Sequence, residues 1–215
     1  DVKHHIFEQS LNNTNGRFEL SLQTNEANSQ DGYAGVQVLY DRIEHDGLNT
    51  NANLRVFQGV WTHLAVSVTV TDNANASIAI YKNGVLASEV QGDPYSEANV
   101  SFADFRIGYF PFGTADRHFH GLIDQVKVWD SVLTESEVAL SMKTFADEGL
   151  TSKNLRAHID FNGDVVDNEG NFLLAKVGSS TLGDVATTSS SGSDTIVTFP
   201  RSYLTRDGGW TVPTG

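Results

Sequence analysis

The sequence contains no cysteine, and this absence removes several kinds of chemistry from consideration. Without thiols the chain cannot form disulfide bonds, hold zinc through thiolates or use a cysteine nucleophile. Methionine occurs once and proline four times in 215 residues. A chain of this length can nevertheless bury a hydrophobic core large enough to fold without covalent cross-links.

Long apolar stretches are also missing. No run approaches the roughly 18 apolar residues that a membrane-spanning helix requires, so we predict no membrane insertion. Residues 1–10 lack the pattern of a signal peptide, and Asp1 stands in place of Met, which predicts a processed or excised chain.

Charged residues make up only 19 % of the chain, and their balance is one-sided. There are 27 acidic and 14 basic residues, which gives a formal net charge of −13. An acidic surface repels a phosphate backbone, so we expect no nucleic-acid partner. The same surface attracts divalent cations and basic partners, or it serves solubility alone.

Alternation of apolar and polar residues, the pattern of a half-buried β-strand, dominates the first two thirds of the chain. It is clearest where Leu64, Val66, Val68 and Val70 alternate with small or polar residues. Together with 19 glycines and many polar turn residues, this pattern predicts an all-β fold. The other predicted strands are 17–22, 36–40, 77–81, 105–109, 122–129, 157–161 and 195–200.

Two local signals define connections between these elements. Asn83-Gly84 predicts a type I′ hairpin turn, because both central residues of that turn need positive φ. A capping box runs from Thr134 to Glu137 and predicts the start of one short helix. Its predicted buried stripe is Val138, Met142 and Phe145, and its predicted stop is Gly149.

The character of the sequence changes after residue 149. Residues 157–161 read as a further short strand, and residues 178–194 are rich in Ser, Thr and Gly. We therefore predict one domain over residues 1–149. Residues 150–215 are either its closing strands or the start of a second β-module.

Five sequence blocks resemble the laminin-G-like jelly-roll family, which shares its fold with pentraxins and legume-type lectins. In chain order they are residues 61–66, 80–84, 105–108, 119–129 and 133–137. The resemblance implies an antiparallel jelly-roll β-sandwich of the concanavalin A-like type, with one short helix after the last main strand.

Two features depart from the family pattern. The opening strands of the family are not found ahead of Asp1, whereas residues 155–163 look like a domain-opening strand at the far end. Residues 155–200 or a neighbouring chain could supply the missing strands. An edge left unpaired would invite pairing with another chain.

The resemblance also implies a structural calcium ion. In related folds an acidic residue at the start of the closing strand holds calcium together with backbone carbonyls, and Asp124 occupies that place. Alternatively, Asp124 caps a turn or pairs with Arg106 or Lys127. Residues 160–167 resemble the opening of an EF-hand loop, but Val165 stands where glycine is required, so we predict a polar turn.

An aromatic loop is the candidate ligand site. Exposed rings suit stacking on a sugar, and polar neighbours would fix the sugar hydroxyls. The same rings could instead be buried in the core. The predicted ligand-binding residues are Tyr109, Phe110, Phe112, Asp116, Arg117 and His118. His118 and His120 would share one face of a strand, but no third zinc ligand is identifiable.

Glycosylation and catalysis are the remaining sequence questions. Sequons at Asn12, Asn75 and Asn99 permit N-glycosylation. Neither the Glu-x-Asp-x-x-Glu strand of related glucanases nor a Gly-x-Ser-x-Gly elbow occurs, so we predict no enzymatic activity.

The resemblance thus implies a non-catalytic, extracellular binding module of a larger surface or secreted protein, which recognises carbohydrate or a glycoconjugate. The alternative is a structural adhesion module whose partners are extracellular proteins, including neighbouring chains or tandem modules. The aromatic loop favours the first hypothesis, and the missing opening strands favour the second.

Overall fold

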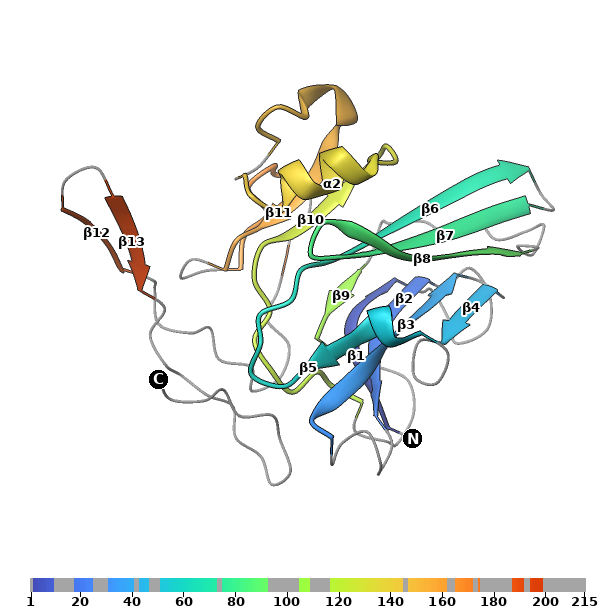
Figure 1. The fold of residues 1–215 in the computed structure, drawn as a ribbon. Helices are drawn as coiled ribbons and strands as arrows, with labels where there is room; N and C mark the ends of the chain where they lie inside the picture. Colours follow the sequence, from blue (N-terminus) through green and yellow to red (C-terminus); the bar gives the residue numbers. More distant parts are fainter. Residues whose placement is uncertain are drawn as a thin grey trace. The chain divides into compact units, whose positions relative to one another are not determined.

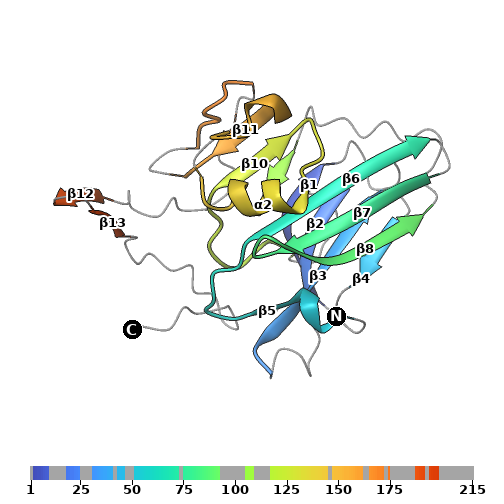
Figure 2. The same cartoon turned by 45° about the horizontal axis from the view of Figure 1, so that its top comes forward.

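The computed structural model describes residues 2–9, 18–24, 31–40, 43–46, 51–72, 75–92, 105–108, 117–144, 147–161, 165–171, 174, 187–191 and 194–198. These residues form antiparallel strands, one α-helix and two short 3-10 helices (Figures 1 and 2). The chain divides into two compact units. One contains the described residues of 1–120 and 132–144, and the other those of 121–131 and 145–211.

The larger sheet of the first unit has the strand order β4-β3-β2-β1-β9, with β5 also paired to β3. Its strands are β1 (Val2–Gln9), β2 (Phe18–Thr24), β3 (Tyr33–Tyr40), β4 (Ile43–Asp46), β5 (Arg55–Phe57) and β9 (Arg106–Ile107). β2 and β3 confirm the strands predicted at 17–22 and 36–40. One face of the sheet carries buried apolar side chains, among them Phe18, Leu20, Leu22, Val36 and Val38.

The opposite face of this sheet is polar and also buried. Successive side chains of a strand point to opposite faces, so Glu19 and Ser21 lie on the face away from Leu20. His5 and Gln37, directly opposite Ser21 on the neighbouring strands, are buried as well. Ser21 Oγ donates a hydrogen bond of 2.9 Å to Glu19 Oε1, and His5 Nδ1 lies 3.5 Å from the same oxygen. The alternation predicted the polarity of this face but not its burial.

A second sheet of the first unit has the order β6-β7-β8. Its strands are β6 (Leu64–Asp72), β7 (Asn75–Lys82) and β8 (Val85–Gly92). Asn83 and Gly84, between β7 and β8, both have positive φ (53° and 82°), which confirms the predicted hairpin turn. Ile78 and Ile80 of β7 are fully buried.

Side-chain hydrogen bonds connect the second sheet to its neighbours within the unit. Asn51, at the start of the 3-10 helix η1 (Ala52–Leu54), donates from Nδ2 to the Ala87 carbonyl at 3.1 Å. Lys82 Nζ donates to the Arg55 carbonyl, also at 3.1 Å. These bonds attach β7 and β8 to the segment that leads into β5.

The helix α2 (Glu135–Ser141) begins at the predicted capping box. The Thr134 side chain accepts from the Glu137 N–H, and Glu137 Oε2 accepts from the Thr134 N–H at 2.7 Å. Val138 is buried, as predicted, whereas Met142 is half-buried and Phe145 lies outside the described residues. The helix ends at Ser141, so the predicted stop at Gly149 is wrong. The helix packs closely on the β7–β8 turn: a β-carbon at Gly84 would lie only 3.1 Å from Ala139 Cα and Cβ.

The second unit contains two strand pairs, β10 (Val126–Trp129) with β11 (Leu155–Ile159), and β12 (Thr187–Ser191) with β13 (Asp194–Thr198). The 3-10 helix η2 (Thr151–Lys153) precedes β11. The strand predicted at 122–129 is wrong over its first half. Gln125 has a φ of 52° and donates its N–H to Asp124 Oδ1 at 2.8 Å, so extended pairing starts only at Val126.

No helix in the described part of the chain is long and apolar enough to cross a membrane.

Candidate functional site

Only two of the six residues predicted to bind a ligand lie in the described segments. Arg117 and His118 are attached to β1 through their backbones. The Arg117 carbonyl accepts from the His5 N–H at 2.9 Å, and the His118 carbonyl accepts from His4 Nδ1 at 3.1 Å. Both residues are half-buried. The predicted residues that lie outside the described ones are Tyr109, Phe110, Phe112 and Asp116.

Histidines gather beside this attachment point. The rings of His4 and His120 meet edge to face with centroids 5.6 Å apart. No group of three or more His, Cys, Asp or Glu side chains within the described residues is arranged to hold a metal ion. The His118–His120 pair is therefore not joined there by a third zinc ligand.

Exposed aromatic side chains occur at a different place, in the turn between β5 and β6. Residues 57–61, hereafter the aromatic turn, include Phe57 at 52 % exposure, Val60 at 62 % and Trp61 at 59 %. Gly59 has a φ of 75°, which lets the chain reverse between the two aromatic residues. The sequence-based prediction missed this site, because Trp61 was assigned to the family pattern. The sequence feature that could have revealed the site is Gly59 between Phe57 and Trp61, two aromatic residues that both lie outside the alternating apolar–polar runs.

The aromatic turn is held on the sheet by β3. Phe57 pairs with Tyr33 across the β3–β5 ladder, and their ring centroids lie 6.0 Å apart. The Arg55 guanidinium lies 4.5 Å from the centroid of the Tyr33 ring, a cation–π distance. The Gln58 N–H donates to the Gly32 carbonyl at 2.9 Å. Backbone and side-chain contacts therefore both fix the base of the turn.

Asp124, the predicted calcium ligand, lies in the second unit. Burial raises its pKa, the hydrogen bond from the Gln125 N–H opposes this, and the nearby negative charge of Asp160 raises the pKa further. The bond to Gln125 agrees with the alternative that Asp124 caps a turn. Calcium takes six to eight oxygens, so Asp124 and Asp160 would need several backbone carbonyls as additional ligands. Calcium binding stays a prediction.

His158 is a buried histidine on β11, beside the same acidic residues. The ring atom Nε2 of His158 lies 3.0 Å from Gln125 Oε1. The backbone N–H of His158 donates a hydrogen bond of 2.9 Å to Asp167 Oδ1. Burial is the largest effect and lowers the pKa of His158, and the positive charge of Lys127 lowers it further. Nearby carboxylates such as Asp160 raise the pKa but do not outweigh these two effects. The neutral imidazole is thus the form that the fold favours.

The segment after β11 is organised by one buried carboxylate. Asp167 accepts from the N–H groups of His158, Glu169 and Asn171 at 2.9, 3.1 and 2.9 Å. This bonding uses both carboxylate oxygens on backbone groups and closes a turn at residues 167–170. The polar turn predicted from the sequence covers residues 160–167, of which 162–164 lie outside the described residues, so it stays a prediction.

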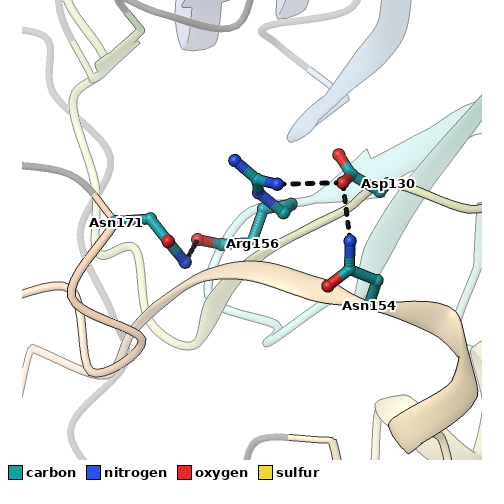
Figure 3. A network of polar contacts seen from close by, with 4 residues as sticks. All are labelled: Asp130, Asn154, Arg156 and Asn171. Atoms are coloured by element: carbon teal, nitrogen blue, oxygen red, sulfur yellow. Dashed lines mark hydrogen bonds and ion pairs between the residues drawn. The ribbon is translucent and has the colours of Figure 1, made fainter.

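A second polar network joins the end of β10 to the start of β11 (Figure 3). Asp130 Oδ2 accepts from Asn154 Nδ2 at 2.7 Å and from Arg156 at 3.2 Å. Asn171 Nδ2 donates to the Arg156 carbonyl at 2.9 Å, which attaches the following turn to β11. The network fixes the position of β11 along β10.

Of the three sequons, Asn75 alone lies in the described part of the chain. It is exposed at the first position of β7, where a glycan would face solvent. Asn12 and Asn99 lie outside the described residues. Glycosylation at all three positions stays a prediction.

Within the described residues, the antiparallel sheets, the hairpin turn at Asn83-Gly84 and one capped helix are consistent with a concanavalin A-like β-sandwich. The family model described as the concanavalin A-like lectin/glucanases superfamily, of the laminin-G type, matches residues 3–139. The chain belongs to this family, as the five sequence blocks predicted. No curated protein and no solved structure gave a match.

Proposed function

We propose that the chain is a non-catalytic carbohydrate-binding module of an extracellular protein, and that the aromatic turn makes the principal contact with the sugar. The observation that carries this proposal is the exposure of Phe57 and Trp61 within one short turn. Large apolar side chains that gather on a surface mark a binding site, because covering them recovers hydrophobic free energy.

The chemistry of a sugar ring complements this turn. One face of many pyranose rings presents mainly C–H groups, which pack on an aromatic face while the hydroxyls remain available for hydrogen bonds. Gln58 in the turn offers an exposed side-chain amide. Asp31 offers an exposed carboxylate close by, because it precedes Gly32, whose carbonyl accepts the hydrogen bond from the Gln58 N–H. Aromatic and polar groups are thus present together.

The attachment of the turn to β3 supports binding without rearrangement. Phe57 is fixed by strand pairing with Tyr33, whose ring is itself contacted by Arg55. A site whose side chains are already positioned loses less conformational entropy on binding.

Catalysis is not part of the proposal, and the two carboxylates that face each other across β1 and β2 are buried. Glycoside hydrolysis needs two carboxyl groups that flank the bound sugar. Glu8 and Glu19 lie directly opposite each other on β1 and β2, but both are buried. Glu19 accepts the hydroxyl of Ser21. Glu19 is therefore part of a buried hydrogen-bond network.

The first test is retardation of the full chain by immobilised polysaccharides, in calcium and in chelator. Trp61→Ala and Phe57→Ala should abolish the retardation. Val70→Ala is the control: it removes an apolar side chain on β6 that is as exposed as Phe57, and it should leave the retardation unchanged. If no polysaccharide retards the native chain, or if the two aromatic variants bind like it, the proposal is wrong and a protein partner becomes the better account.

A further inference from the structure

Strand β11 lies outside the part of the chain that the family model matches. β10 falls within residues 3–139, whereas β11 begins at Leu155. Among the described residues, β11 is the strand paired with β10. The last strand of the family domain is therefore paired with a segment from beyond that domain.

The apolar contacts of this pair are specific in register. Val126 lies opposite Ile159, and Val128 lies opposite Ala157, in an antiparallel ladder. Ala157 and Ile159 are completely buried, and Leu155 nearly so. A slip of one residue would turn these side chains to the other face, so the burial selects a single register.

Polar contacts make the pairing specific in sequence as well. Asp130, at the end of β10, binds both Asn154 and Arg156 of the incoming segment (Figure 3). Gln125, just before β10, meets the ring of His158. An extended segment that docks on β10 must therefore offer an amide, a guanidinium and an imidazole at these three positions. This chain's own sequence meets that requirement.

The connection between the two strands does not force them to pair within one chain. Asp130 and Asn154 are 24 positions apart, and helix α2 of the other compact unit lies between them in the sequence. A two-residue hairpin would dictate pairing within the chain. A long connection gives the tethered strand an effective concentration on the order of millimolar or below, which a second chain can match when chains are concentrated or refold together.

We propose that β11 of one chain docks on β10 of a second copy, so that the chain assembles by strand exchange. The occupant is a second copy because the segment that fits β10 in register and in polar contacts is this chain's own. Reciprocal exchange closes a dimer, and one-way exchange continues into a filament. This assembly rests on contacts in the second unit and is independent of sugar binding.

Cysteine cross-linking tests the exchange, because the native chain has no cysteine. Lys127 and His158 face each other across the pair. Chains carrying Lys127→Cys alone and chains carrying His158→Cys alone are mixed at high concentration, refolded together and oxidised. Exchange predicts at least tenfold more covalent heterodimer than a control mixture in which Lys153→Cys replaces His158→Cys.

The double variant Lys127→Cys/His158→Cys reports the pairing itself. If it forms a link within the chain while the mixture gives no more heterodimer than the control, strand exchange is overturned. If neither sample forms a link, the β10–β11 pair does not exist and the proposal fails as well.

Sedimentation of unmodified chains provides a second measurement, because a change at the buried His158 could perturb folding. We expect the native chain to form dimers or larger species after refolding at high concentration. Ala157→Asp should eliminate them by placing a charge in the buried ladder. A native chain that remains monomeric throughout contradicts the proposal.

Discussion

Replacing Gly84 by alanine tests the packing of helix α2 on the β7–β8 turn. Gly84 has a φ of 82°, where an L-residue costs about 1–2 kcal/mol. The new β-carbon would also lie 3.1 Å from both Cα and Cβ of Ala139. Overpacking of this kind typically costs about 1–3 kcal/mol, so the free energy of unfolding should fall by about 2–5 kcal/mol in all.

Gly32→Ala provides a matched control. Gly32 has a similar φ of 72°, but nothing lies within 4 Å of the position of its β-carbon. Urea denaturation of both variants should therefore show a loss of only about 1–2 kcal/mol for Gly32→Ala. Ala139→Gly should cost less in the Gly84→Ala background than in the native chain, because removing the Ala139 β-carbon relieves part of the clash and offsets part of the cost of glycine in the helix. Equal losses for the two glycine variants would refute the close contact.

Three further changes test individual interactions. Thr134→Ala removes the helix cap and should lower the free energy of unfolding by about 1 kcal/mol in urea denaturation, whereas an unchanged midpoint would contradict the capping box. The lowered pKa of His158 predicts stability that is complete above about pH 6.5 and is lost as the pH falls toward the folded-state pKa. His158→Gln should flatten this dependence in thermal unfolding between pH 5 and 7, and an identical profile would exclude His158 as its source. Because burial raises the pKa of Asp124, Asp124→Asn should stabilise the metal-free chain at pH 7 and should lose any calcium-dependent rise in melting temperature. A rise that survives the substitution would place calcium elsewhere.

Local sequence patterns correctly predicted strand β6 and the β7–β8 turn, because short-range alternation and turn residues determine these elements. Leu64, Val66 and Val68 alternate in sequence and form β6, and Asn83-Gly84 forms the turn whose positive φ values few other residues adopt. The family match over residues 3–139 likewise followed from blocks with fixed spacing. Even here, β10 was predicted too long, because the positive φ of Gln125 is invisible in an otherwise alternating run.

Features that depend on long-range contacts could not be predicted. The pairing of β5 with β3, which positions Phe57 beside Tyr33, is specified by no local pattern. The exposure of Trp61 is likewise not written in its neighbouring residues. The burial of Glu19 on the polar face of β2 depends on the rest of the fold. Residues 155–200 were one of the two predicted sources of the missing opening strands, but the pairing of β11 with β10 was not predicted, because a sequence does not specify which strand edge a segment pairs with.

The most direct test of carbohydrate binding is titration calorimetry with whichever polysaccharide retards the native chain. The measurement compares the dissociation constants of the native chain, Trp61→Ala and Val70→Ala. We predict at least a tenfold weaker constant for Trp61→Ala, equivalent to about 1.4 kcal/mol, and an unchanged constant for Val70→Ala. Native affinity in Trp61→Ala would show that the aromatic turn does not contact the sugar and would contradict the proposed function of this surface.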